Sequence, residues 1–147
     1  MLVQHRTASK LQLVRRSYRM LEDLRKDPDG PADRVARDLM DERFELRLPD
    51  TYPEGAQGFY GHDGLQKWTA WTREVWGEWR FEVERLIEAG QRVVALVHVV
   101  AKGGLSGVRL ERDTAHVWTL ANGKVLRCEV YLDRSDGLAA VGLSAHD

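Results

Sequence analysis

The chain has 147 residues, of which 43% are hydrophobic, which is enough to bury a core within one domain. Its 22 basic and 23 acidic residues are interspersed and give a net charge of −1, so we expect neither nucleic acid nor an anionic membrane as a partner. The single cysteine, Cys128, excludes an internal disulfide, and residues 1–10 lack the apolar segment of a secretion signal. These features predict one domain, residues 1–147, in a reducing cytoplasm.

Two helices are predicted before residue 40. Thr7 or Ser9 can cap the first, and the apolar residues that follow recur at spacings of three and four, which places Tyr18 on the buried face. A cluster of Pro, Asp and Gly at residues 27–31 predicts a turn, and a short second helix follows at residues 35–39. Tyr18 is therefore predicted to point inward.

The middle of the chain alternates between strand, loop and helix. Residues 44–48 have the pattern of a strand, and residues 49–64 are rich in Pro and Gly, which predicts a loop that could gate a pocket. The helix predicted after this loop places Leu65 and Trp68 along one side.

Strands dominate the second half of the chain. They are predicted at residues 79–87, 92–102 and 108–120, ahead of a final hairpin. Helices first and an antiparallel sheet afterwards indicate an α+β fold with helices on one sheet face.

The final hairpin lies within residues 116–133 and turns at Asn122-Gly123. This dipeptide favours a two-residue type I′ turn, because both central residues must take positive φ. Regular pairing from that turn places Val117 opposite Cys128 and His116 opposite Glu129. Strict alternation then predicts an apolar face with Ala115, Val117, Thr119, Leu126, Cys128, Val130 and Leu132, and a polar face with His116, Trp118, Arg127, Glu129 and Tyr131.

The order of these elements, with residues 87–107 followed by residues 115–134 and the short GLAAVGL tail, resembles the SnoaL-like branch of the nuclear transport factor 2-like superfamily. The resemblance covers nearly the whole chain. It implies a cone, in which N-terminal helices close one end of a curved, mostly antiparallel sheet around an apolar pocket, and the convex face commonly makes a homodimer. Members include ketosteroid isomerases, polyketide cyclases and dehydratases, so the resemblance leaves the reaction open.

The ketosteroid isomerase mechanism needs a tyrosine, a protonated carboxylic acid and a carboxylate base, and this sequence has only the tyrosine. Tyr18 matches the family's tyrosine on the first helix, whereas the general base would fall on Leu48 and the acid that stabilises the oxyanion would fall on Ala115. Neither of these side chains can move a proton, so this mechanism is not expected. Asp50 could replace the base only if its loop bends inward. Tyr18 and Asp50 are the resulting catalytic candidates.

The resemblance also implies a pocket for a small apolar or aromatic molecule. Tyr18 would be its main polar contact, although a tyrosine on a helical core face also packs as an ordinary core residue. The other pocket residues are expected to be Leu48, Phe59, Leu65, Trp68, Ala115, Val117, Cys128 and Val130. No cofactor and no metal are expected.

The polar face of the hairpin allows two interpretations. His116 beside Glu129, joined by His98 from a neighbouring strand, could form an acid/base pair, but no tight ligand spacing supports a metal. The simpler interpretation is a homodimer interface, which the aromatic and charged residues of this face suit.

Two functions follow from the sequence and the resemblance. The domain is expected either to act as an isomerase, cyclase or lyase on a ring-bearing carbonyl compound, or to be a noncatalytic homodimeric module for ligand sensing or interaction.

Overall fold

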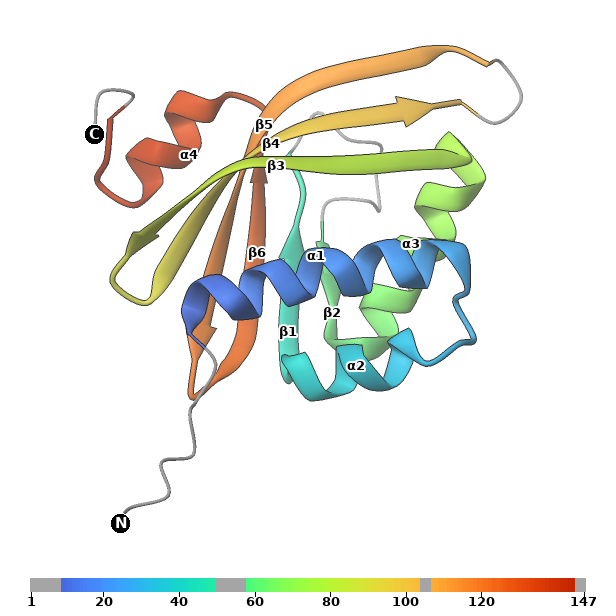
Figure 1. Ribbon diagram of the computed structural model, residues 1–147, viewed down its shortest axis with the longest axis horizontal. Helices are drawn as coiled ribbons and strands as arrows, with labels where there is room; N and C mark the ends of the chain where they lie inside the picture. The colour runs from blue at the N-terminus through green and yellow to red at the C-terminus, as the bar shows by residue number, and fades with distance from the viewer. Residues whose placement is uncertain (1–8, 50–57, 104–106, 145–147) are drawn as a thin grey trace.

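The computed structural model describes residues 9–49, 58–103 and 107–144 (Figure 1). In chain order its elements are α1 (Lys10–Lys26), α2 (Ala32–Leu39), β1 (Met40–Arg47), β2 (Gly58–Tyr60), α3 (Gly61–Trp76), β3 (Glu78–Ala89), β4 (Arg92–Lys102), β5 (Arg109–Ala121), β6 (Lys124–Tyr131) and α4 (Arg134–Ala140). The strands form one sheet in the order β2-β1-β6-β5-β4-β3, in which only β1 and β6 pair in parallel. The predicted α+β fold is confirmed.

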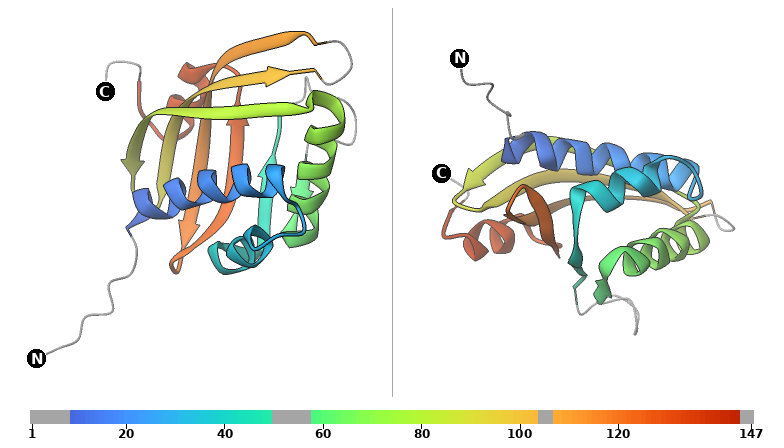
Figure 2. Two further views of the ribbon diagram at one scale, coloured as in Figure 1. Left: turned by 45° about the vertical axis from the view of Figure 1, so that its right-hand side comes forward. Right: turned by 90° about the horizontal axis from the view of Figure 1, so that it is seen from below.

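The first helix begins where the sequence predicts, at a capping box. The Ser9 hydroxyl accepts a hydrogen bond from the backbone N–H of Gln12, and the Gln12 side chain accepts one from the backbone N–H of Ser9. The buried face of α1 includes Val14, Tyr18 and Leu21, so Tyr18 points inward as predicted. In Figure 1 this helix crosses in front of the sheet, and Figure 2 shows how strongly the sheet bends.

The predicted loop at residues 49–64 is shorter than expected at its end. Residues 50–57 lie outside the described part of the chain, but β2 pairs with β1 and α3 begins directly after it at Gly61. Gly64 allows this close approach, because a Cβ at that position would lie 2.8 Å from the backbone carbonyl carbon of Phe59. The helix that carries Trp68 therefore packs tightly against the sheet edge.

The turn of the final hairpin is confirmed, but the faces predicted from it are wrong beyond Leu120. Asn122 and Gly123 have φ of 54° and 76°, as a type I′ turn requires. The register then shifts between Leu120 and Thr119, because Leu126 is an extra residue in β6 and forms a β-bulge. Trp118 consequently pairs with Cys128, where regular pairing would place Val117.

The bulge redistributes the side chains between the two faces. His116 and Trp118 lie on the concave face with Cys128 and Val130, whereas Ala115, Val117, Arg127, Glu129 and Tyr131 lie on the convex face. The five residues expected to form one polar face are thus divided between the two sides of the sheet. A homodimer interface made of all five is excluded by this register.

The fourth helix, α4, was not predicted and explains the apolar residues of the convex face. Asp133 caps it by accepting a hydrogen bond from the backbone N–H of Ser135 at 2.8 Å. Its Leu138 packs in a small core cluster with Ala115 and Val117. The main core, in contrast, lies between the concave face and the three earlier helices. Within the described ranges, no helix is long and apolar enough to cross a membrane.

Candidate functional site

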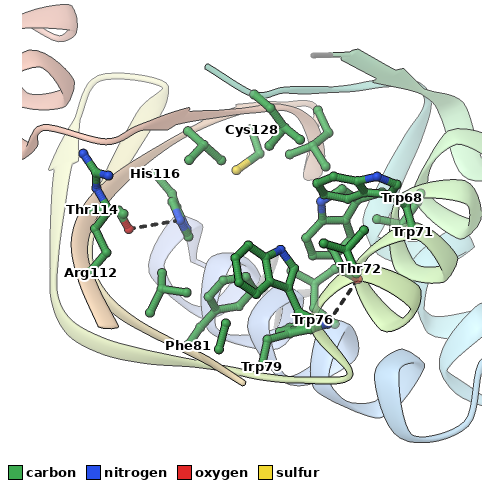
Figure 3. A pocket seen from close by; sticks show the side chains of 18 of the residues that line it. Trp68, Trp71, Thr72, Trp76, Trp79, Phe81, Arg112, Thr114, His116 and Cys128 are labelled. Atoms are coloured by element: carbon green, nitrogen blue, oxygen red, sulfur yellow. Dashed lines mark hydrogen bonds between the residues drawn. The ribbon is translucent and has the colours of Figure 1, made fainter. Parts of the chain in front are cut away.

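A cavity of about 460 Å³ lies against the concave face (Figure 3). This volume falls within the range of small-molecule sites. Seven aromatic side chains of the described residues line it, namely Phe44, Trp68, Trp71, Trp76, Trp79, Phe81 and Trp118. The polar side chains of the described lining are Thr72, Arg112, Thr114 and His116, together with the thiol of Cys128. The cavity is therefore apolar and aromatic, with a few polar groups at defined places.

The aromatic wall is held in place by contacts between the rings and by one hydrogen bond. The ring centroids of Trp68 and Trp79 are 5.3 Å apart, and those of Trp79 and Phe81 are 4.9 Å apart. The indole N–H of Trp79 donates to the Thr72 hydroxyl at 3.1 Å, and that hydroxyl donates to the carbonyl of Thr69 at 2.9 Å. These contacts fix the orientation of the Trp79 ring.

A chain of hydrogen bonds runs from Trp118 through Tyr18 to His116 on the concave face. An indole N–H can only donate, so the Tyr18 hydroxyl accepts from Trp118 at 2.9 Å. The buried hydroxyl also has one proton to donate, and among its described contacts the acceptor within reach is Nδ1 of His116, 2.7 Å away. His116 Nδ1 is therefore an acceptor, which assigns the ring proton to Nε2.

Burial keeps this chain uncharged. His116 is 4% exposed, and desolvation lowers its pKa to about 3, so the imidazole is neutral at physiological pH. Burial also raises the pKa of Tyr18 well above its ordinary value, as does the nearby Cys128, while the hydrogen bond from Trp118 acts in the opposite direction. The pKa of the Cys128 thiol is likewise raised by burial, which makes it a neutral wall residue.

The Nε2–H of His116 is the polar group that the chain presents to the cavity. It lies 3.4 Å from the Thr114 hydroxyl, a long contact, and that hydroxyl itself donates to the carbonyl of Val97 at 3.2 Å. Among the described residues the cavity is lined by His116 and Trp118 but not by Tyr18. Tyr18 thus lies behind His116 and sets its tautomer.

The predicted pocket residues divide into three groups. Leu48, Leu65, Trp68, Cys128 and Val130 line the cavity. Phe59 is half-buried and packs against the main core, outside the described lining. Ala115 and Val117 lie on the opposite sheet face beneath α4, because the bulge turns them away. Asp50 lies outside the described residues.

Regular strand alternation predicts His116 and Trp118 on the outer face together with Glu129. The bulge instead brings His116 and Trp118 to the cavity and leaves Glu129 outside. His98 and Glu129 lie on the convex face, so the proposed second site of His98, His116 and Glu129 does not form. The described ranges contain no group of three potential metal ligands.

The family model for the SnoaL-like domain matches residues 14–128, which include most of α1, the sheet strands up to Cys128 and most of the cavity wall. The chain belongs to the SnoaL-like domain family. A comparison with curated proteins finds no match.

Solved structures show the same SnoaL-like fold. TerC, co-crystallised with polyporic acid, is 24% identical with a TM-score of 0.68, over 88% of this chain and 96% of that one. A nuclear transport factor 2-like protein from Burkholderia pseudomallei is 23% identical with a TM-score of 0.68, over 90% and 96% of the two chains. A protein with a ketosteroid isomerase-like fold from Catenulispora acidiphila, in complex with trimethylamine, is 13% identical with a TM-score of 0.60, over 87% and 95%. At these identities the likeness concerns the fold.

Proposed function

We propose that this SnoaL-like domain binds a small ring-bearing carbonyl compound in its aromatic cavity, with the Nε2–H of His116 donating to the carbonyl oxygen. The single observation that carries the proposal is the hydrogen bond from Tyr18 to His116 Nδ1, because it leaves the other ring nitrogen as a donor facing the cavity. Apolar walls with one placed donor suit a ligand of this kind. The complex of TerC with polyporic acid, a structure of the same fold, supports the choice of a small-molecule ligand.

The same geometry supports an isomerase, cyclase or lyase that acts on such a ligand. Negative charge that develops on the carbonyl oxygen would be stabilised by the N–H of His116 at the apolar wall of the cavity. Tyr18 is the positioning residue in this scheme, because its hydroxyl holds the tautomer. A proton removed from carbon would pass to water, since the described lining holds no carboxylate.

That lack of a carboxylate also favours the second candidate function, a noncatalytic ligand-sensing module. Both functions use the same cavity and the same donor. They differ in whether the bound carbonyl compound reacts. Exchange of the protons next to the carbonyl in D₂O distinguishes them: exchange that His116→Phe abolishes assigns an enzyme, and intact binding without exchange assigns a sensing module.

Binding itself is tested with 4-acetylbiphenyl and 4-ethylbiphenyl, which differ mainly in the carbonyl oxygen. The quenching of tryptophan fluorescence measures both affinities, because tryptophans line the cavity. One hydrogen bond predicts that the ketone binds about three- to tenfold more tightly. His116→Phe should remove this preference, and Thr119→Ala, on the convex face of the same strand, should keep it. Equal affinities for the two compounds in the unmodified protein would contradict the proposal.

The role of Tyr18 requires a readout other than affinity. ¹⁵N chemical shifts of His116 should show an unprotonated Nδ1 and a protonated Nε2 in the unmodified protein, as the hydrogen bond from Tyr18 requires. Tyr18→Phe should mix the two tautomers and weaken the preference for the ketone. An unchanged tautomer in Tyr18→Phe would show that Tyr18 is only a core residue.

We further propose that the domain is a cytoplasmic homodimer. The convex face supports this, because it carries Arg127 and Tyr131, and arginine and tyrosine are enriched at protein interfaces. The buried single cysteine agrees with a reducing compartment. Sedimentation of the unmodified protein and of Arg127→Glu should give a dimer and a monomer, respectively; a monomer in both cases would contradict the proposal.

A further inference from the structure

We propose that the ligand also carries an anionic oxygen, such as a carboxylate, which Arg112 binds at the mouth of the cavity. The inference rests on the proposed function, because it extends the same cavity toward solvent. Arg112 is the only charged side chain in the described lining. A cation that faces an otherwise apolar cavity favours ligands of opposite charge.

The exposure of the lining residues locates the mouth. Val75 at the end of α3 is 44% exposed and Leu110 at the start of β5 is 47% exposed, and Arg112 next to Leu110 on the same face is exposed as well. His116 is buried. Figure 3 shows Arg112, Thr114 and His116 in succession along one wall of the pocket. The wall therefore leads from a solvated cation to a buried hydrogen-bond donor.

The acidic neighbours of Arg112 in sequence do not neutralise it. Strand alternation directs Glu111 and Asp113 to the convex face. There Glu111 accepts from Arg109 at 2.8 Å, and Asp113 contacts His98 at 2.7 Å. Arg112 itself has no ion pair within 4.0 Å among the described residues. Its positive charge is thus available on the concave side.

The carboxylate of Asp133 is close enough to Arg112 for its pKa to be affected, but it already caps α4. The pKa of Asp133 is lowered mainly by hydrogen bonds from Ser135 and only slightly by Arg112. Asp133 Oδ1 accepts from both the backbone N–H and the hydroxyl of Ser135, at 2.8 and 2.7 Å, as the cap of α4. Asp133 therefore lowers the positive potential at the mouth, but it forms no ion pair with Arg112 among the described residues.

The spacing along β5 sets the size of the ligand. Arg112 and His116 are four residues apart on one face, which corresponds to about 13 Å between their Cα atoms. Two linked or fused rings fill a gap of that order between the two side chains. A guanidinium also matches the two oxygens of a carboxylate. The chemical class is therefore an aromatic keto acid, with its ketone at His116 and its carboxylate at Arg112.

The test compares 4′-acetylbiphenyl-4-carboxylate with its methyl ester at pH 8 and low salt, by calorimetry. We expect the unmodified protein to bind the acid about three- to tenfold more tightly than the ester. Arg112→Gln should bind acid and ester equally, with the affinity for the ester unchanged. Arg112→Lys should keep part of the preference. Arg109→Gln is the matched control, because Arg109 lies on the same strand and its side chain pairs with Glu111 on the other face.

The outcomes separate this inference from the proposed function. An equal acid preference in Arg112→Gln and in the unmodified protein overturns the inference, and so does equal binding of acid and ester by the unmodified protein. In either case, ester binding that His116→Phe weakens leaves the proposed function standing. Binding of neither compound overturns both. Because Arg112 is exposed, its variants should keep the unmodified melting temperature, which confirms that each measurement concerns a folded protein.

Discussion

Two histidines on neighbouring strands show how differently the two faces of this sheet treat one side chain. His116 on β5 faces inward, where it contacts Tyr18 and Thr114, and burial lowers its pKa to about 3. His98 on β4 faces outward, where its hydrogen bond to Asp113 raises its pKa, with a further contribution from Glu111. Burial disfavours the charged imidazole on one face, and a neighbouring carboxylate favours it on the other.

The difference lies in what replaces water around each ring. The concave chain of Trp118, Tyr18, His116 and Thr114 is buried, and each of its hydrogen bonds has a fixed direction. The convex ion pairs are solvated and screened by salt, so each of them stabilises little. Changes in this buried chain should therefore cost more stability than changes among the solvated side chains of the convex face, and four experiments test this.

The largest effect is expected from Trp118→Ala. Trp118 is 1% exposed and is the largest fully buried side chain, so its removal leaves a cavity and should lower the free energy of unfolding by about 3–5 kcal/mol. Urea denaturation measures the change. The control is Thr119→Ala, the next residue on the opposite face, which should cost less than about 1 kcal/mol. Similar losses in the two variants would remove the distinction between the faces.

Tyr18→Phe should have the next largest effect. It keeps the ring but leaves the N–H of Trp118 and Nδ1 of His116 buried without their partner, which should cost about 2–4 kcal/mol. Tyr131→Phe removes the matching hydroxyl on the convex face, where it donates to Glu129 at 3.3 Å in a partly exposed position. That variant should cost at most about 0.5 kcal/mol. A smaller loss for Tyr18→Phe than for Tyr131→Phe would reverse the comparison.

The sequence predicts the turn of the final hairpin well and the faces beyond it poorly. Asn122-Gly123 specifies the turn, because few dipeptides take positive φ at both positions. The bulge at Leu126 has no such signal, since neither it nor its neighbours are glycines. Because side chains alternate along a strand, one extra residue changes the sheet face that regular pairing predicts for every residue beyond the bulge. His116 was for this reason expected outside the cavity. Tyr18 was expected to be the main polar contact on separate grounds, namely its position on the first helix and the family resemblance.

The fourth helix illustrates a second limit. Residues 134–140 include Gly137, which disfavours a helix in isolation. The helix forms because Leu138 packs onto the sheet and because Gly137 lets the backbone approach closely, since a Cβ there would lie 2.5 Å from that of Ala115. Such tertiary contacts are not visible in local sequence. The earlier helices, with regular apolar spacing and a capping box in α1, are visible there and were found.

The loss of stability at acid pH should include a contribution from His116. In the unfolded chain an imidazole binds a proton below about pH 6.5, whereas folded His116 does so only near its pKa of about 3. The unfolded state therefore takes up the proton first, and stability falls as the pH is lowered, by about 2 kcal/mol between pH 8 and 5. Urea denaturation at several pH values should show a shallower slope for His116→Phe, and an identical slope would contradict the assignment.

His98 should show the opposite sign and the smallest effect. Because its folded pKa is raised, its contribution to stability is fully present below about pH 6.5 and is lost as the pH rises through the folded pKa. His98→Gln should thus lower stability slightly at pH 6 and leave it unchanged at pH 9. Imidazole proton resonances give a direct check, with the His98→Gln variant for assignment. The His98 resonance should change with a midpoint above pH 6.5, while the His116 resonance should keep one chemical shift from pH 8 to 5. The two side chains are chemically identical, so only their environments can cause such a difference. Two rings that titrate together would therefore contradict the proposed difference between the two faces.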